Sequence, residues 1–333
     1  MQSIRQHLLD GHVIPACPLP LHADGSWSEK HQRALARYYA EAGAGGLAVG
    51  VHSTQFEIRD PQHSLFEPVL ELVAGELPDR MAKIAGLCGD TSQAIAEAEF
   101  ALGCGYQAGL LSMKAVGDRP DAAILDHCRE VASVIPIIGF YLQPAVGGRI
   151  FSYQFWREFA EIENLVAIKL APFDRYLSID VVRAVAASGR EDVALYTGND
   201  DNIIADLLTP FPGGRRIVGG LLGQWGVWTQ QAVATLNEIK ALEGMIPEHL
   251  MTENAILTEA NAVIFDAANG FAGCIPGIME VLRRSRLAPS NRCLNRDEIL
   301  SPGQAEELDR IERSYPQLGD HPFIEQNIDR WLA

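Results

Sequence analysis

A single lysine interrupts an apolar segment in the middle of the chain. Lys169 lies in the sequence LVAIKLA at residues 165–171, a run that is typical of a buried strand. Burying a charged amine costs several kcal/mol unless the amine is paired, so burial lowers the pKa of lysine and favours its neutral form. A neutral amine can attack a carbonyl carbon and form a Schiff base. Alternatively, Lys169 ends the strand and its ammonium group reaches water.

The segments that must position this lysine alternate between short apolar runs and longer helical patterns. The apolar runs are nearly continuous, as expected for parallel strands that are covered on both faces. Eight such runs, with helical patterns between them, predict a (β/α)8 TIM barrel. The predicted strands are residues 12–17, 46–51, 83–88, 108–112, 136–141, 165–169, 193–197 and 217–221.

After residue 244 the pattern changes to helices and turns. Helical patterns are predicted at residues 251–268, 276–285 and 302–314, and no linker rich in proline or serine precedes them. We therefore expect residues 1–244 to form the barrel, as the catalytic domain, and residues 245–333 to form a C-terminal helical extension packed on it.

Charge and composition argue against several classes of function. The net charge of −16 disfavours nucleic acid and anionic membranes as partners. No apolar run is long enough to span a membrane, and the N-terminus lacks the apolar core of a signal peptide. The six cysteines are scattered without a C-x-x-C pair, and no metal-binding or nucleotide-binding motif occurs. The sequence thus predicts a cytoplasmic protein that uses no metal and no cofactor.

Small and polar residues occur near the predicted strand ends, where the active site of a (β/α)8 barrel is built from the carboxyl-terminal side. Together with Lys169, these residues could converge on one substrate pocket although they lie far apart in the chain. Lys114 could pair with a substrate carboxylate or simply be solvated. The candidates are Gly50, Val51, His52 and Ser53 after the second strand, Lys114 after the fourth, Tyr141 ending the fifth, Thr197 ending the seventh, and Val218 with Gly219 in the eighth.

Several motifs along the chain carry a resemblance to a known family. They are Asp24-Gly25, residues 42–50, Asp118-Arg119-Pro120, Tyr141 with Pro144, residues 166–169, and Thr197-Gly198 with Asp200. With these motifs the chain resembles the dihydrodipicolinate synthase and N-acetylneuraminate lyase family, the class I lyases and aldolases that form Schiff bases. The resemblance covers roughly residues 10–300 and implies one barrel with a helical tail.

The resemblance implies a role for each matched residue. Lys169 would form the Schiff base, and Tyr141 would transfer protons while the carbinolamine forms and breaks down. Backbone from Gly50 to Ser53, and near Val218-Gly219, would hold the carboxylate and the imine-side atoms of the substrate. The resemblance also implies a homodimer or homotetramer. Taken alone, Tyr141 is better explained as a packing aromatic whose hydroxyl is hydrogen-bonded, whereas its combination with Lys169 favours the catalytic role.

Two regions depart from the family pattern. A Gly-Thr-Thr-Gly-Glu run is usual after the second strand, whereas this chain has Val51 and His52 at the two threonine positions. His52 could serve as acid, base or carboxylate donor, because imidazole titrates near neutrality, or it could be a hydrogen-bonded residue at the rim. The paired tyrosines of the synthase correspond to Val116 and Gly117, and its aldehyde-binding arginine falls near Val146. These departures argue against the synthase reaction itself.

The sequence therefore predicts a lyase or aldolase that acts on a 2-oxo acid, pyruvate or a pyruvate-derived adduct, through an imine at Lys169. The reaction would be carbon–carbon cleavage or condensation, or dehydration. Two alternatives stay open. One is a diverged barrel that binds a keto acid or a sugar without turnover, and the other is a cofactor-free isomerase or hydrolase that uses His52.

Overall fold

A sheet of eight strands organises the fold. The computed structural model describes residues 3–144 and 147–333, so that Val146 lies outside the described residues. The strand order is β1-β8-β7-β6-β5-β4-β3-β2, and the pairings from β3 to β8 are parallel. Strands that follow each other in the chain are therefore neighbours in the sheet, with helices between them. This is a (β/α)8 barrel with a C-terminal helical region, which confirms the predicted fold class.

The chain forms two compact units, one from the residues up to His12 with Ala82–Leu221 and the other from Val13–Met81 with Leu222–Ala333. The helical tail thus shares a unit with the first part of the barrel sequence. The expected division into residues 1–244 and 245–333 stays a prediction. In the part of the chain that the structure describes, no helix has the length and apolar character needed to cross a membrane.

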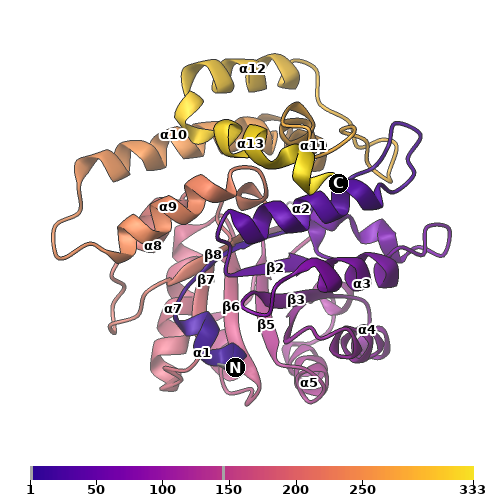
Figure 1. The fold of residues 1–333 in the computed structure, drawn as a ribbon. Coiled ribbons are helices and arrows are strands. Elements are labelled where there is room, and N and C mark those ends of the chain that lie inside the picture. Colours follow the sequence, from indigo (N-terminus) through magenta and orange to yellow (C-terminus); the bar gives the residue numbers. More distant parts are fainter. Residues whose placement is uncertain (1–2, 145–146) are drawn as a thin grey trace. The chain divides into compact units, whose positions relative to one another are not determined.

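The first unit contains most of the strands. Its helices α4 and α5 lie side by side along the outside of their strands (Figure 1). The strands are β3 (Ala82–Leu87), β4 (Ala108–Leu111), β5 (Ile137–Leu142), β6 (Leu165–Ala171), β7 (Ala194–Thr197) and most of β8 (Gly219–Leu222). The helices are α1 (Ile4–Leu9), α4 (Thr91–Gly103), α5 (Asp121–Ala132), α6 (Tyr153–Phe159), α7 (Arg175–Ser188) and α8 (Ile203–Leu208).

Local sequence sets where the helices of this unit begin and end. The carboxylate of Asp90 accepts a hydrogen bond from the N–H of Gln93 and starts α4. Asp174 accepts bonds from two N–H groups in the first turn of α7, and Gly189 ends that helix with a φ of 71°. Side chains that satisfy free N–H groups, and glycine in the left-handed region, are the usual helix boundaries.

The second unit combines two strands with the helical tail. Helices α10 to α13 gather in its C-terminal part, and α13 packs along α2 (Figure 1). Its strands are β1 (Val13–Pro15) and β2 (Gly46–Val49), and its short 3-10 turns include η1 (His52–Thr54). Its helices are α2 (Glu29–Glu41), α3 (Phe66–Glu76), α9 (Thr229–Lys240), α10 (Glu248–Ile264), α11 (Cys274–Arg284), α12 (Gln304–Ser314) and α13 (His321–Trp331).

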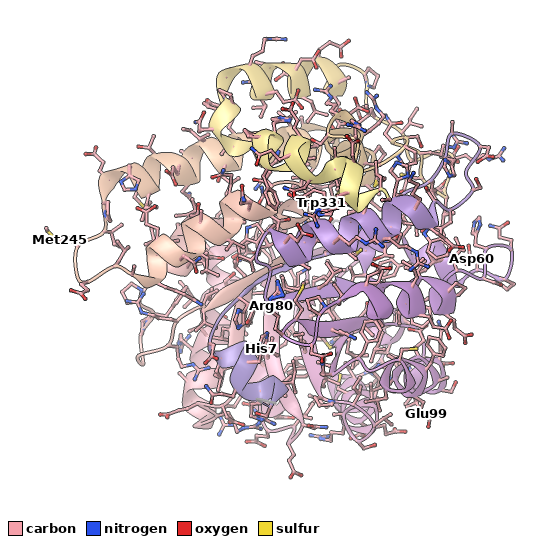
Figure 2. All side chains as sticks on the ribbon, viewed as in Figure 1. His7, Asp60, Arg80, Glu99, Met245 and Trp331 are labelled. Carbon is pink, nitrogen blue, oxygen red and sulfur yellow. The ribbon has the colours of Figure 1, made fainter. Side chains whose placement is uncertain are left out.

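The last helix, α13, was not predicted from the sequence, and buried polar contacts hold it in place. Trp331 is fully buried at its end, against α2 (Figure 2). Just before α13, Asp320 is 2% exposed and accepts hydrogen bonds from the Tyr38 hydroxyl (2.6 Å) and from the N–H of Gln230 (2.7 Å) and of Gln231 (3.2 Å). Asp320 thereby satisfies free N–H groups at the start of α9, although it lies far away in the sequence.

Candidate active site

Lys169 lies in the middle of β6, and every residue of this strand is buried. Its own exposed fraction is 9%. The register of the sheet pairs it with Phe140 on β5 and with Tyr196 on β7. Residues paired in register point to the same face of a sheet, so all three side chains share one face. The Lys169 Nζ lies 4.4 Å from the centroid of the Phe140 ring.

Gly198, directly after β7, gives the lysine side chain its room. A Cβ atom at Gly198 would lie 2.5 Å from Cε and 3.1 Å from Cγ of Lys169. Such contacts are far inside van der Waals separation, so any larger residue at this position would push the lysine aside. Within the Thr197-Gly198 motif, it is therefore the absence of a side chain at Gly198 that leaves space for Lys169.

The surroundings of Lys169 favour the neutral amine. Burial lowers its pKa from 10.5 to about 8, and the nearby carboxylate of Asp200 opposes that shift. Burial disfavours the charged form because an ammonium group loses its hydration, whereas a negative neighbour stabilises it. With this pKa, roughly a tenth of the amine is uncharged at pH 7, far more than for an ordinary lysine, and the uncharged form is the one that a nucleophile requires.

Phe140 is the residue of β5 that lies beside Lys169, and Tyr141, the next residue, lies on the opposite face of the strand. Its ring packs at 4.8 Å from the ring of Trp156 on α6. Gly139, two residues earlier and so on the same face, would direct a Cβ to within 2.5 Å of Phe159, also on α6. The phenol therefore belongs to the layer between β5 and α6, where burial raises its pKa.

The proton-transfer role expected for Tyr141 stays a prediction, although its ring packs toward α6. Because side chains alternate along a strand, a shift of one residue moves a side chain to the other face. The spacing between Tyr141 and Lys169 in the sequence does not reveal the face, and Phe140 takes the position beside the amine. Sequence analysis gave Phe140 no role in the site. The register of β5 against β6 identifies it, and that register depends on an irregularity at Ile137-Ile138.

Thr197 is also turned away from the lysine. Its hydroxyl donates a hydrogen bond to Asp206 on α8 (2.7 Å), and it is fully buried. Asn199 donates to the same carboxylate (3.0 Å) and accepts from the N–H of Phe173 (3.0 Å). Arg175 pairs with Asp206 as well. Thr197 thus holds the loop that carries Gly198, and its expected contact with the substrate stays a prediction.

Val218 and Gly219 lie at the beginning of the last strand instead of at its carboxyl end. The strand β8 begins at Gly219, two residues later than predicted. A Cβ at Gly219 would lie 2.5 Å from the carbonyl oxygen of His12 and 2.9 Å from the ring of Tyr196. The space in front of Gly219 is therefore filled by protein. The expected substrate contacts at Val218 and Gly219 stay predictions.

The turn after β2 belongs to the second unit and is held by one hydroxyl. Thr54 Oγ accepts hydrogen bonds from the N–H groups of Gly50 (3.0 Å) and Val51 (3.2 Å) and donates to the carbonyl of Cys17 (2.6 Å). Ser53 directs its hydroxyl to the carbonyl of Ala16 (3.0 Å). These two N–H groups are thus engaged inside the protein, and the expected anion site at Gly50 and Val51 stays a prediction.

His52 begins the short 3-10 turn that follows, and its ring lies 5.9 Å from the ring of Phe56. It is half-buried. The role of His52 and of the Ser53 backbone in substrate binding stays a prediction.

Among the described residues, no group of three or more His, Cys, Asp or Glu side chains is arranged to hold a metal ion.

Lys114 follows the carboxyl end of β4 and lines a cavity of about 440 Å³. The cavity is lined by Ser112, Lys114, Phe140, Leu142, Arg149 and Phe151, among others. Lys114 itself is exposed. Phe140 borders both this cavity and the amine of Lys169.

Comparison with known proteins decides the family. The family described as "Dihydrodipicolinate synthetase family" matches residues 10–220. The chain belongs to this family. The matched residues include every candidate site residue discussed above and end within β8.

Individual relatives are distant. A 4-hydroxy-tetrahydrodipicolinate synthase from Cyanothece sp. (strain PCC 7425 / ATCC 29141) is 26% identical over 275 residues, which cover 80% of this chain and 90% of the relative. The crystal structure of dihydrodipicolinate synthase from Oceanobacillus iheyensis has a TM-score of 0.73 and 19% identity, over 92% of this chain and 96% of that chain. N-acetylneuraminate lyase from Fusobacterium nucleatum has a TM-score of 0.72 and 17% identity, over 92% and 99% of the two chains. Structural likeness at such identities shows the fold alone.

The position of Tyr141 leads to a direct prediction for this member of the dihydrodipicolinate synthetase family. Tyr141→Phe should change the rate of covalent capture of pyruvate at Lys169 by less than about twofold, because the hydroxyl faces α6. The rate can be measured by reductive trapping and mass spectrometry. As a matched substitution on the other face, Phe140→Leu should change that rate clearly, because the ring contacts the amine. A large loss in Tyr141→Phe with intact folding would contradict the described placement.

Proposed function

We propose that this protein is a Schiff-base-forming lyase or aldolase that acts on a 2-oxo acid. Lys169 attacks the keto carbon as a neutral amine and gives a carbinolamine, which loses water to leave a protonated imine. The imine then accepts the electron pair of a neighbouring bond during carbon–carbon cleavage or dehydration, or stabilises the enamine for condensation. Pyruvate, or an adduct derived from it, is the simplest substrate of this class.

One observation carries the proposal, namely a lysine buried in the middle of a barrel strand with a lowered pKa. The exposed fraction of 9% and the pKa of about 8 are what a catalytic amine requires. Perturbed pKa values also occur in structural ion pairs, but this amine has an aromatic ring beside it and no ion pair is recorded for it among the described residues. Membership of the dihydrodipicolinate synthetase family adds support.

We assign proton transfer in this site to a residue other than Tyr141. Phe140 is the aromatic residue beside the amine, and it has no hydroxyl group that could donate or accept a proton. The carboxylate of Asp200, whose charge acts on Lys169, is the residue that we assign to this step. After the neutral amine has attacked, the carboxylate would take a proton from the adduct nitrogen and return one to the departing hydroxyl group.

Borohydride reduction in the presence of pyruvate tests the proposal. Reduction converts a protonated imine into a stable secondary amine, so peptide mass spectrometry should find the added group on Lys169 and on no other lysine. Lys30, which is exposed on α2, serves as an internal control for unspecific modification. Absence of any adduct on Lys169 in folded protein would refute the proposed chemistry.

The rate of trapping should rise with pH. Because only the neutral amine attacks, and because the pKa of Lys169 is about 8, the rate should increase roughly tenfold per pH unit below this value and level off above it. Asp200→Asn removes the charge that raises this pKa, so the midpoint should move to lower pH. Rates of trapping measured from pH 6 upward check this, with Asp126→Asn as an exposed control outside the cavity. A midpoint near that of free lysine would contradict it.

A second candidate function is binding of a keto acid without turnover. The observation that favours it is Phe140 beside the amine, because the hydroxyl expected for proton relay is absent there. Reductive trapping at Lys169 together with no product release from any tested aldol adduct would support this second candidate over the lyase.

A further inference from the structure

The cavity at the ends of β4 and β5 lies close to the Schiff-base lysine. The register pairs Leu111 with Gly139, so the next residues along each strand, Ser112 and Phe140, are neighbours on the same face. Both line the cavity, whose volume is about 440 Å³. This volume falls within the usual range for small-molecule pockets. The ring of Phe140 thus borders both this space and the Lys169 amine.

The charge that this cavity offers to a ligand comes from Lys114. The Lys114 side chain extends over Gly147, where a Cβ would lie 2.6 Å from Cε and 2.8 Å from Nζ. Gly147 has a φ of 93°, so the backbone there favours glycine and leaves room for the lysine. Within residues 3–144 and 147–333, no ion pair or side-chain hydrogen bond is recorded for the Lys114 ammonium group.

The other charged groups of the cavity are less suited to a ligand. Arg149 donates to the carbonyls of Gly117 (2.9 Å) and Arg119 (2.8 Å) and pairs with Asp121 (2.5 Å), so its guanidinium is used to hold the preceding loop. Asp118 adds one negative charge to the lining. One available cation beside one carboxylate suits a singly charged ligand group better than a doubly charged phosphate.

We propose that Lys114 is a specificity-determining residue that binds a second carboxylate at the far end of the substrate. This inference rests on the proposed function, because it assumes that the 2-oxo group of the substrate reacts at Lys169. The carbon chain of a substrate bound as the imine would pass the Phe140 ring and end in the cavity. There the Lys114 ammonium and the Ser112 hydroxyl could bind its distal group. The substrate class is therefore a 2-oxo acid, or its adduct, that carries a distal carboxylate.

Two five-carbon probes test the inference, namely 2-oxoglutarate and 2-oxopentanoate, which differ in the distal carboxylate. The half-saturating concentration for borohydride trapping at Lys169 should be at least about tenfold lower for 2-oxoglutarate, since hydrogen bonds to charged groups are worth this much. Lys114→Met should reduce the preference to about twofold or less, because the hydrocarbon is kept and the charge is lost. Lys114→Arg should retain part of the preference.

Lys30→Met is the matched control, because it removes an exposed lysine on α2 that is not part of the cavity, and its preference should equal that of the wild type. Equal half-saturation for both probes in the wild type, or an unchanged preference in Lys114→Met, would overturn the inference. The shift of the unfolding temperature by each probe is measured in parallel. If 2-oxoglutarate shifts the unfolding temperature in a way that depends on Lys114 but no adduct is trapped, the carboxylate site at Lys114 is supported and the imine at Lys169 is refuted.

Discussion

Lys169→Met is expected to abolish covalent capture of 2-oxo acids while the protein stays folded. Methionine has a similar length and no nucleophilic nitrogen, so trapping and any turnover should fall by at least about 10³-fold, as is usual when a covalent nucleophile is removed. Peptide mass spectrometry after borohydride treatment measures the adduct, and circular dichroism verifies the fold. Lys30→Met, at an exposed position, should trap like the wild type.

The same substitution should stabilise the protein near neutral pH. Burial lowers the pKa of Lys169 from 10.5 to about 8. A shift of this size corresponds to roughly 3 kcal/mol of unfavourable free energy while the amine is charged, so a gain of about 1–3 kcal/mol in the free energy of unfolding is expected. Natural active sites often reduce stability in this way.

The pH dependence of that gain has a definite sign. The unfolded chain keeps the lysine proton up to about pH 10.5, whereas the folded protein releases it near pH 8. The unfolded state therefore binds more protons between these values, and the stability of the wild type rises with pH across this window. Urea unfolding at several pH values should show the difference between wild type and Lys169→Met shrinking from pH 8 toward pH 10.5. Parallel stabilities over the window would show that the amine is not buried as described.

Asp206→Ala should cause the largest loss of stability, about 3–5 kcal/mol, because removing one partner of a buried charged network leaves the others unsatisfied. Asp206 is fully buried and accepts hydrogen bonds from Thr197 (2.7 Å) and Asn199 (3.0 Å) in addition to its pairing with Arg175. Because this network holds the loop with Gly198, trapping at Lys169 should also slow. Urea unfolding and trapping rates measure both effects.

Asp180→Ala is the control for this prediction. Asp180 and Arg183 both lie on α7 and form an ion pair within that helix, and both side chains are largely exposed. Exposed pairs of this kind contribute about 0–1 kcal/mol, so the control should unfold at nearly the wild-type urea concentration. If Asp206→Ala were no less stable than Asp180→Ala, the carboxyl group of Asp206 would not hold the loop as described.

The alternation of apolar runs and helical patterns was sufficient to predict the barrel. Each strand is covered on both faces, so it reads as an uninterrupted apolar segment, and this local signal survives without tertiary information. Lys169 was identified for the same reason, because a charged residue inside such a segment conflicts with its surroundings. The helix α13 was missed, since Asp320 and Trp331 are explained by contacts with Tyr38 on α2 and not by their sequence neighbours.

The orientation of side chains at the strand ends required the folded structure. Tyr141 and Thr197 have the residue types expected of a site, yet each lies on the helix-facing side of its strand. Strand side chains alternate with a period of two, so the register between neighbouring strands decides whether Phe140 or Tyr141 meets the amine. Register results from pairing over the whole sheet. The chain sequence alone therefore indicates which chemistry to look for, and the packing of β5, β6 and β7 selects the residues that can take part.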